Sequence, residues 1–157
     1  MVTDDAFRMT CSRFATGVAI ATVEAEGGAL HGMTINSFTS VSMDPPLILI
    51  CVEHGCNLLP IFSRSGRYGL SVLRRSQEAL SVRFAIRGHD RFDGVESVAG
   101  RTGIRLIPGA LAYFECSVRE MVEAGDHTVV IGTVDHCEAH EGEPLLFFDS
   151  AYRRMYP

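Results

Sequence analysis

The sequence predicts a mainly β protein whose strands form a closed or partly open barrel, with two or three short helices beside it. Apolar and β-branched runs typical of strands arrive roughly every 10 to 15 residues through most of the chain. Turn signals join several of these runs directly, as in antiparallel hairpins. No strand is followed by a GxGxxG turn that opens a helix, and this disfavours a Rossmann domain.

The first third of the chain predicts a helix, a hairpin and a buried strand. An apolar stripe at helical spacing runs from Thr3, the expected N-cap, to Gly17. Strands at 18–24 and 30–34 enclose a Gly-Gly turn, which predicts a hairpin. After the rigid Asp44-Pro45-Pro46 break, residues 47–52 are almost wholly apolar, so we expect a strand buried on both faces.

The remainder alternates short helices with strands and ends in a long hairpin. The predicted elements are helices at 57–64 and 76–85, strands at 68–73, 112–123, 128–138 and 145–148, loops with a short helix and one strand over 86–109, and an arginine-rich tail. The residues 124–127, Ala-Gly-Asp-His, form the expected turn of the long hairpin. We find no internal repeat or linker, and therefore expect one domain over residues 1–157.

Composition excludes several classes of function. The net charge of −5 argues against a nucleic-acid partner, which needs a basic face. All 14 basic residues are arginine. Without lysine there is no Schiff base, no covalent pyridoxal phosphate and no P-loop. A cofactor phosphate must therefore be held by arginine, hydroxyl groups or backbone N–H groups.

The cysteines and the apolar runs predict a cytoplasmic protein. Five cysteines are an odd number without the dense spacing of a disulfide scaffold, and Cys11, Cys51 and Cys116 lie in apolar runs, which predicts buried thiols. The beginning of the sequence has two acids and no apolar segment typical of a signal peptide. No run approaches the length of a membrane span, so we expect no membrane association.

The segment 31–52, HGMTINSFTSVSMDPPLILICV, is the strongest candidate for a binding site. It places six hydroxyl and amide side chains immediately before a buried strand: Thr34, Asn36, Ser37, Thr39, Ser40 and Ser42. Such groups offer donors and acceptors to a planar heteroaromatic ligand. The alternative is an ordinary polar turn ended by Asp-Pro-Pro.

Four ordered blocks resemble the flavin reductase family, the small partners of two-component monooxygenases. Besides the segment 31–52, the blocks are FATGVAIAT at 14–22, YGLSVL with SQEALSVRFA within 68–85, and AGDHTVVIGTV at 124–134. The resemblance covers nearly the whole chain. It implies a split β-barrel of Greek-key order that binds FMN, flanked by two or three short helices, and a homodimer.

The resemblance also implies the flavin contacts. Residues of the 31–52 segment would line the isoalloxazine and the ribityl chain, and residues after the buried strand would border the ribityl and phosphate side. The implied residues are Met33, Thr34, Ile35, Asn36, Ser37, Ser40, Cys51, Val52, Glu53, Cys56 and Asn57. Many relatives carry lysine, serine or threonine in the stretch that here reads EHGCN, which leaves the phosphate contacts open.

Two further blocks supply a cation and a histidine. Arg83 and Phe84 match the family position beside the cofactor phosphate. They lie in a basic region, 64–91, which contains seven arginines and only two acidic residues, Glu78 and Asp90. Alternatively, many of these arginines lie on solvated helix faces. The Gly-Asp-His turn implies that His127 lies beside the nicotinamide and that Asp126 orders the turn or orients the histidine.

The sequence gives less support to a metal site or to serine hydrolase chemistry. The His136, Cys137 and His140 spacing resembles a metal site, but neighbours on a strand point to opposite faces, so we expect no metal. No GxSxG elbow supports serine hydrolase chemistry.

The expected activity is the transfer of hydride from NADH or NADPH to FMN or FAD, with release of reduced flavin to a partner monooxygenase. The alternatives are a flavin-binding module without turnover and, further away, a barrel like that of pyridoxamine-phosphate oxidase.

Overall fold

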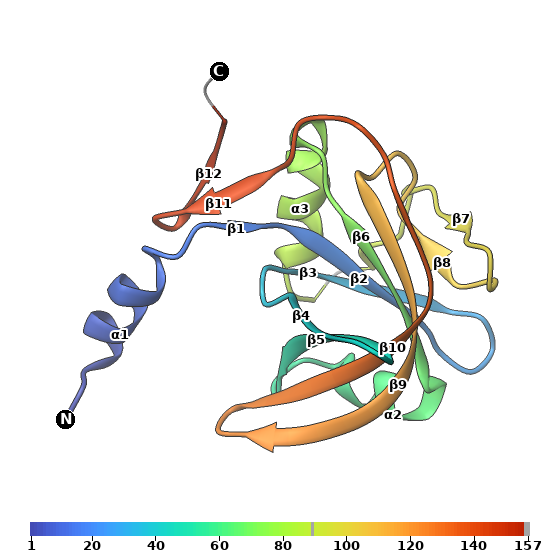
Figure 1. The fold of residues 1–157 in the computed structure, drawn as a ribbon, viewed down its shortest axis with the longest axis horizontal. Coiled ribbons are helices and arrows are strands. Elements are labelled where there is room, and N and C mark those ends of the chain that lie inside the picture. Colours follow the sequence, from blue (N-terminus) through green and yellow to red (C-terminus); the bar gives the residue numbers. More distant parts are fainter. Residues whose placement is uncertain (89, 156–157) are drawn as a thin grey trace.

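The computed structural model describes residues 1–88 and 90–155 (Figure 1). The elements in chain order are α1 (Asp4–Cys11), β1 (Thr16–Gly17), β2 (Ala19–Glu24), β3 (Leu30–Ile35), β4 (Thr39–Met43), β5 (Pro46–Glu53), α2 (Leu59–Ser65), β6 (Arg67–Val72), the 3-10 turn η1 (Arg75–Gln77), α3 (Glu78–Ala85), β7 (Val98–Ala99), β8 (Arg105–Leu106), β9 (Ala112–Ala124), β10 (His127–Ala139), β11 (Leu146–Phe148) and β12 (Ala151–Arg153). The protein is mainly β, and the described residues contain three α-helices.

The main sheet is antiparallel, and in the described residues it has seven strands in the order β3-β2-β6-β9-β10-β5-β4. β9 and β10 form a long hairpin through its centre, as Figure 1 shows. The edge strands are β3 and β4, and they follow each other in the chain with only 36–38 between them. No hydrogen-bonded pairing joins these two edges in the described residues, so the ladder itself is open.

The larger core cluster lies on one face of this sheet. Its buried members include Ile48, Ile50 and Val52 of β5, with Tyr68 and Leu70 of β6. The β5 residues between them are half-buried, so the expectation that this strand is buried on both faces is wrong. Helices α2 and α3 pack against β2, β3, β6 and β9, and the outer face of β5 therefore remains partly open.

A smaller core cluster fixes α3 against the other side of β2. Ile20 of β2 and Phe84 of α3 are completely buried in it, together with Leu73 and Ile107. This cluster matters for function because α3 leads directly into the loop that forms one wall of the cavity described below.

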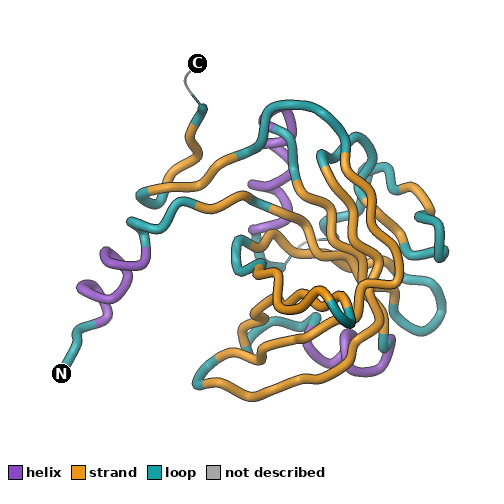
Figure 2. The backbone as a smooth tube through the Cα atoms, in the orientation of Figure 1, coloured by secondary structure: helices purple, strands orange, loops and turns teal. Residues whose placement is uncertain are grey.

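The two ends of the chain form an arm that stands away from the main sheet, which both Figure 1 and Figure 2 show. β1 pairs with β11, and β11 pairs with β12, in a separate three-stranded sheet that follows α1. No residue of α1 is buried. Cys11 is therefore exposed, contrary to the prediction of a buried thiol, whereas Cys116 is buried and Cys51 is half-buried.

The structure changes several predicted boundaries. α1 ends at Cys11 rather than at Gly17, because Thr16 and Gly17 pair with the C-terminal strand β11. Residues 39–43, predicted only as a polar segment, form the strand β4. The predicted tail contains β12, and the helix at 76–85 begins as the turn η1 before α3. Within the described residues, no helix is long and apolar enough to cross a membrane.

Candidate functional site

A cavity of about 1050 Å³ opens between β3, the end of β5 and the loop after α3. This volume is of the size that protein sites for cofactors and other small ligands have. Three segments and one histidine line it: 29–37, then Cys51, Glu53, 55–58 and Ile61, then Phe84, Ala85, Arg87, Gly88 and 90–93, and finally His127.

The first wall is β3, an edge strand of the main sheet. In the described residues β3 pairs only with β2, so its other edge presents backbone N–H and C=O groups toward the cavity. One of these, the Gly32 carbonyl, accepts a hydrogen bond from Arg91 Nη1 at 2.6 Å. A row of alternating donors and acceptors is well suited to the polar edge of a planar heterocycle.

Side-chain hydroxyls on this wall are already engaged. Thr34 Oγ1 donates to the carbonyl oxygen of Ser81 in α3 at 2.6 Å. Ser37 Oγ accepts from the Cys51 N–H at 2.9 Å, which ties the chain after β3 to β5. Among the described residues, the Asn36 side chain has no such bond and is exposed at the cavity. Thr34 and Ser37 therefore set the shape of the wall, and Asn36 offers a free amide.

The second wall is the loop after α3, held against β3 by aromatic and arginine contacts. Phe84 and Phe92 pack edge to face with ring centroids 5.0 Å apart. A Cβ on Gly32 would lie 2.7 Å from the Phe84 ring, so glycine allows this close approach. Arg91 Nε donates to the Ile86 carbonyl at 2.8 Å, and Arg83 Nε donates to the Arg91 carbonyl at 2.8 Å. The loop conformation is thus fixed by two arginines.

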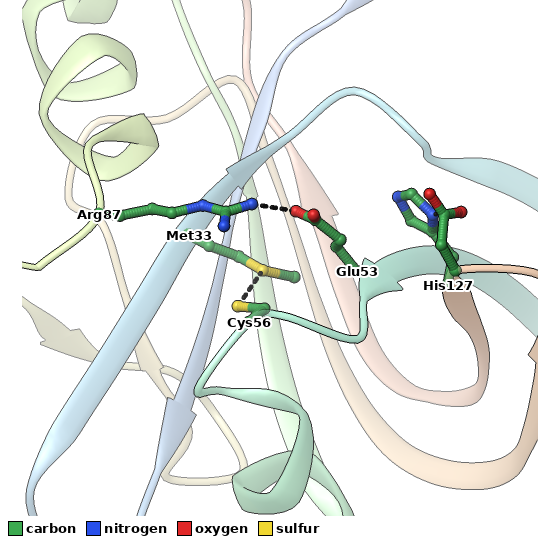
Figure 3. A network of polar contacts seen from close by, with 6 residues as sticks. Met33, Glu53, Cys56, Arg87 and His127 are labelled. Carbon is green, nitrogen blue, oxygen red and sulfur yellow. Dashed lines mark hydrogen bonds and ion pairs between the residues drawn. The ribbon is translucent and has the colours of Figure 1, made fainter. Parts of the chain in front are cut away.

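The third wall is the end of β5 and the turn after it (Figure 3). Glu53 forms an ion pair with Arg87, which reaches across from the end of α3. Cys56 Sγ lies 3.7 Å from Met33 Sδ, so a thiol and a thioether face the cavity together. Burial raises the pKa of the Cys51 thiol, which keeps it neutral.

His127 stands on the far side of Glu53, because the first residue of β10 pairs with the last residue of β5. Its Nδ1 lies 2.7 Å from Asp126 Oδ1. The carboxylate accepts this hydrogen bond, which lowers the pKa of Asp126. With Nδ1 engaged, Nε2 is the ring nitrogen left for a ligand.

The cavity brings together most of the predicted site residues. Those that line it are Met33, Thr34, Ile35, Asn36, Ser37, Cys51, Glu53, Cys56, Asn57, Phe84 and His127. Ser40, Val52, Arg83 and Asp126 lie outside the lining. Ser40 is exposed on β4, Val52 is buried in the core, the Arg83 guanidinium binds loop carbonyls, and Asp126 holds His127.

Arg87 and Arg91 are cavity residues that the sequence analysis did not single out. The available signal was the excess of arginine between 64 and 91, which identifies a basic region but not which members face a cavity. In the part of the chain that the structure describes, no cluster of three or more His, Cys, Asp or Glu side chains could hold a metal ion.

Two curated bacterial relatives are similar to this chain over nearly its whole length. The chain is 40% identical over 149 residues to an NADH-dependent flavin reductase of Pseudomonas fluorescens, covering 93% of this chain and 86% of that protein. It is 36% identical over 152 residues to the reductase component of 4-hydroxyphenylacetate 3-monooxygenase of Thermus thermophilus, covering 96% of both chains.

A solved structure shows the same fold. The NADH:FAD oxidoreductase of Streptomyces globisporus, in complex with NAD and FAD fragments, superposes with a TM-score of 0.92 at 36% identity, over 100% of this chain and 98% of that chain. The model of the "Flavin reductase like domain" family matches residues 11–156. The chain belongs to the flavin reductase family.

Proposed function

We propose that the protein is an NAD(P)H-dependent flavin reductase, which transfers hydride from NADH or NADPH to FMN or FAD and supplies the reduced flavin to a partner monooxygenase. The observation that carries this proposal is the cavity itself. The unpaired edge of β3 and His127 both line this one cavity, which supports a site where a flavin and a nicotinamide lie together. The family membership and the activities named for the relatives agree with this assignment.

The residues of the cavity fit a flavin. The β3 edge and the Asn36 amide match a heterocycle with alternating donors and acceptors. Phe92, backed by the buried Phe84, supplies an apolar surface, and Arg87 supplies a cation for a phosphate. We assign the flavin contacts to the predicted flavin residues that line the cavity, apart from Glu53, whose partner is Arg87. Ser40, Val52 and Arg83 then act on the flavin indirectly, through the strands and the loop that they hold.

The nicotinamide side belongs to His127 in this proposal. A bound flavin supplies the hydride acceptor, and the protein supplies positioning and the exclusion of water. Asp126 fixes the imidazole through Nδ1, so that Nε2 can bind the nicotinamide amide or the ring can stack on it. His127 therefore orients the nucleotide, and no proton transfer through it is required.

Three broader features complete the proposal. The sheet curls into a split barrel of Greek-key order, which the three-residue connection between its two edge strands supports. Residues 1–157 form one domain, and two copies form a homodimer through the exposed arm. The protein works in the cytoplasm, where NADH is available and where five free thiols would remain reduced.

The test is a turnover assay with purified protein. Each of FMN and FAD is mixed with NADH or NADPH, and the absorbance of the dihydronicotinamide is followed. Consumption of the nucleotide that depends on added flavin supports a reductase. Retention of flavin without consumption favours the binding module instead, and the absence of both would contradict either assignment.

A further inference from the structure

The ion pair between Glu53 and Arg87 joins two walls of the cavity that come from distant parts of the chain. Glu53 is the last residue of β5, and Arg87 lies just beyond the end of α3 (Figure 3). Both side chains are open to solvent, with 45% and 69% of their surfaces exposed. An ion pair this exposed is weak, and a competing anion can replace the carboxylate at the guanidinium.

Arg87 differs from Arg83 and Arg91 because its guanidinium bonds to a side chain, Glu53, whereas theirs bond to backbone carbonyls. Arg91 donates to the carbonyls of Gly32 and Ile86, and Arg83 donates to the carbonyls of Arg91 and Asp93. Removing either guanidinium from its carbonyls would release the loop. Among the described residues, the Arg87 side chain has Glu53 as its hydrogen-bonding partner. Arg87 can therefore exchange its anionic partner without disturbing the backbone of the loop.

We propose that Arg87 binds the phosphate monoester of the flavin, and that the Glu53 carboxylate occupies Arg87 until the phosphate displaces it. Carboxylate and phosphate are recognised by the same planar fork of N–H groups, so one anion can replace the other at one guanidinium. After displacement, Glu53 remains half-exposed and is solvated by water rather than left buried and unpaired. The inference rests on the proposed function, because it names how this same cavity selects a phosphorylated flavin.

The local sequence gives this exchange the room that it needs. The last residue of β5 and the turn after it read Glu-His-Gly-Cys-Asn, a stretch with no basic side chain other than His54. A Cβ at Gly55 would lie 3.7 Å from Arg87 Nη1 and 3.8 Å from Glu53 Oε1. Glycine therefore keeps the space beside the ion pair free of a side chain, where a phosphate group can approach the guanidinium.

The exchange predicts opposite effects for the two partners. Removing the arginine removes the phosphate contact, whereas removing the carboxylate charge frees the arginine for phosphate. Riboflavin lacks the phosphate but has the same ring and ribityl chain, so its affinity reports every effect that does not pass through the phosphate. The ratio of the FMN and riboflavin dissociation constants within one variant is therefore the quantity to measure.

The experiment is an equilibrium fluorescence titration with FMN and with riboflavin, without nicotinamide. For Arg87→Gln we expect FMN affinity to fall about 10- to 100-fold with riboflavin affinity unchanged, as for a lost charged hydrogen bond. For Glu53→Gln we expect FMN affinity to rise about two- to fivefold, as for removal of a weak competing ion pair. In the double variant this gain should disappear. Arg119→Gln, an exposed arginine on β9, is the control for loss of one positive charge.

Equal changes for FMN and riboflavin in Arg87→Gln would overturn the proposal and leave the ion pair as a brace between the walls. A weaker FMN complex in Glu53→Gln would also overturn it. A third contrary result concerns the ratio of the KM values for NADPH and NADH, measured with riboflavin as acceptor. If this ratio in Arg87→Gln differs from that of the wild-type protein, Arg87 binds the phosphate of the nucleotide instead. The titrations require no turnover, whereas the proposed function fails only if the wild-type protein consumes no nicotinamide with any flavin.

Discussion

Polar side chains of the β3 wall fall into two groups according to whether their hydrogen bonds are already made. Thr34 and Ser37 are bonded to the backbone of α3 and β5. Asn36 lies between them on the chain, exposed at the cavity. A ligand can therefore gain hydrogen bonds from Asn36 without breaking any within the protein.

Asn36→Ala should accordingly weaken flavin binding while leaving the fold intact. Loss of a hydrogen bond that leaves a buried ligand group unpaired costs about 1–3 kcal/mol, roughly a 5- to 150-fold loss of affinity. Fluorescence titration measures this loss, and thermal unfolding of the free protein checks the fold. Ser37→Ala is the matched comparison, because it should lower stability as well as affinity. Unchanged affinity in Asn36→Ala would remove this residue from the flavin site.

A separate prediction concerns the role of His127 in binding the nicotinamide nucleotide. His127→Ala should raise the KM for NADH or NADPH at saturating flavin, on the order of 1 kcal/mol or about fivefold, and leave flavin affinity nearly unchanged. Steady-state kinetics with each nucleotide tests this. The substitution also removes the hydrogen bond that lowers the Asp126 pKa, so that pKa should rise toward its ordinary value in an NMR titration.

Two results would contradict this role of His127. Wild-type KM and kcat for both nucleotides would make the histidine a bystander. Loss of all turnover would mean that it takes part in proton transfer, since hydride passes between the two cofactors without a protein acid or base.

Among the elements, the turn at 100–103 shows how one buried carboxylate fixes a loop. Glu115 of β9 is only 1% exposed, and its oxygens accept hydrogen bonds from the N–H groups of Arg101 and Thr102, each at 2.7 Å. Burial by itself raises the pKa of Glu115, but these bonds and the Thr102 hydroxyl outweigh it, so the pKa lies below its ordinary value.

The lowered pKa gives a pH-dependent contribution to stability. Because the folded pKa is below the unfolded one, the carboxylate stabilises the fold above about pH 4.5, and this stabilisation is lost as the pH falls through the folded pKa. Glu115→Gln places amide hydrogens against backbone donors and should lower the free energy of unfolding by about 1–3 kcal/mol at pH 7. Urea unfolding at pH 7 and below pH 4 should show the difference narrowing in acid.

A matched control lies on the same strand. Glu120→Gln changes an exposed carboxylate of β9 and should change stability little at either pH. If the difference for Glu115→Gln were the same at both pH values, the lost stability would come from packing rather than from the ionised carboxylate.

Elements with a strong local pattern could be predicted from the sequence, whereas those that depend on distant pairing could not. The β2–β3 hairpin follows from its alternation and from its Gly-Gly turn, at which both glycines have positive φ. β1 was missed because its partner β11 lies at the opposite end of the chain. β12 is adjacent to its partner β11 in the sequence, and it was missed because its short, arginine-rich sequence reads as a tail. β4 was missed because its exposed, hydroxyl-rich residues read as a turn, although pairing with β5 makes them a strand.

The site follows the same division. The β3 wall could be predicted, because its polar residues are consecutive in the sequence. Arg87 could not, because it reaches the cavity only after α3 is packed by Phe84 against the second core cluster. Arg83 was predicted as a phosphate ligand from its position in a block, but its guanidinium is directed to loop carbonyls, which sequence alone does not show.

At the scale of the whole molecule, the arm is coupled to the cavity wall. Tyr152 of β12 shares a 2.6 Å hydrogen bond with the buried hydroxyl of Ser81. The carbonyl of the same serine accepts the bond from Thr34 on β3. The C-terminal strand therefore contacts the helix that is bonded to the β3 wall of the cavity, and the packing of the arm bears on that wall.

The arm also carries the largest exposed apolar side chains near the N-terminus. Phe7, Met9 and Phe14 are 62%, 64% and 77% exposed. Monomeric proteins rarely leave such a group of large apolar side chains exposed to water. In our proposed homodimer, a second copy of the chain covers these side chains. In a two-fold dimer each residue contributes twice, once from each copy.

Phe14→Asp should therefore convert the dimer to a monomer. Burying a phenylalanine side chain contributes about 1.5–3 kcal/mol, so its loss from both copies weakens association by about 3–6 kcal/mol, before the added desolvation of two carboxylates. Sedimentation equilibrium over a range of concentrations measures the change in mass. Val98→Asp places the same charge on an exposed valine of β7, away from the arm, and should leave the dimer intact. A monomeric wild-type protein would contradict the homodimer, and an unchanged mass for Phe14→Asp would place its interface elsewhere.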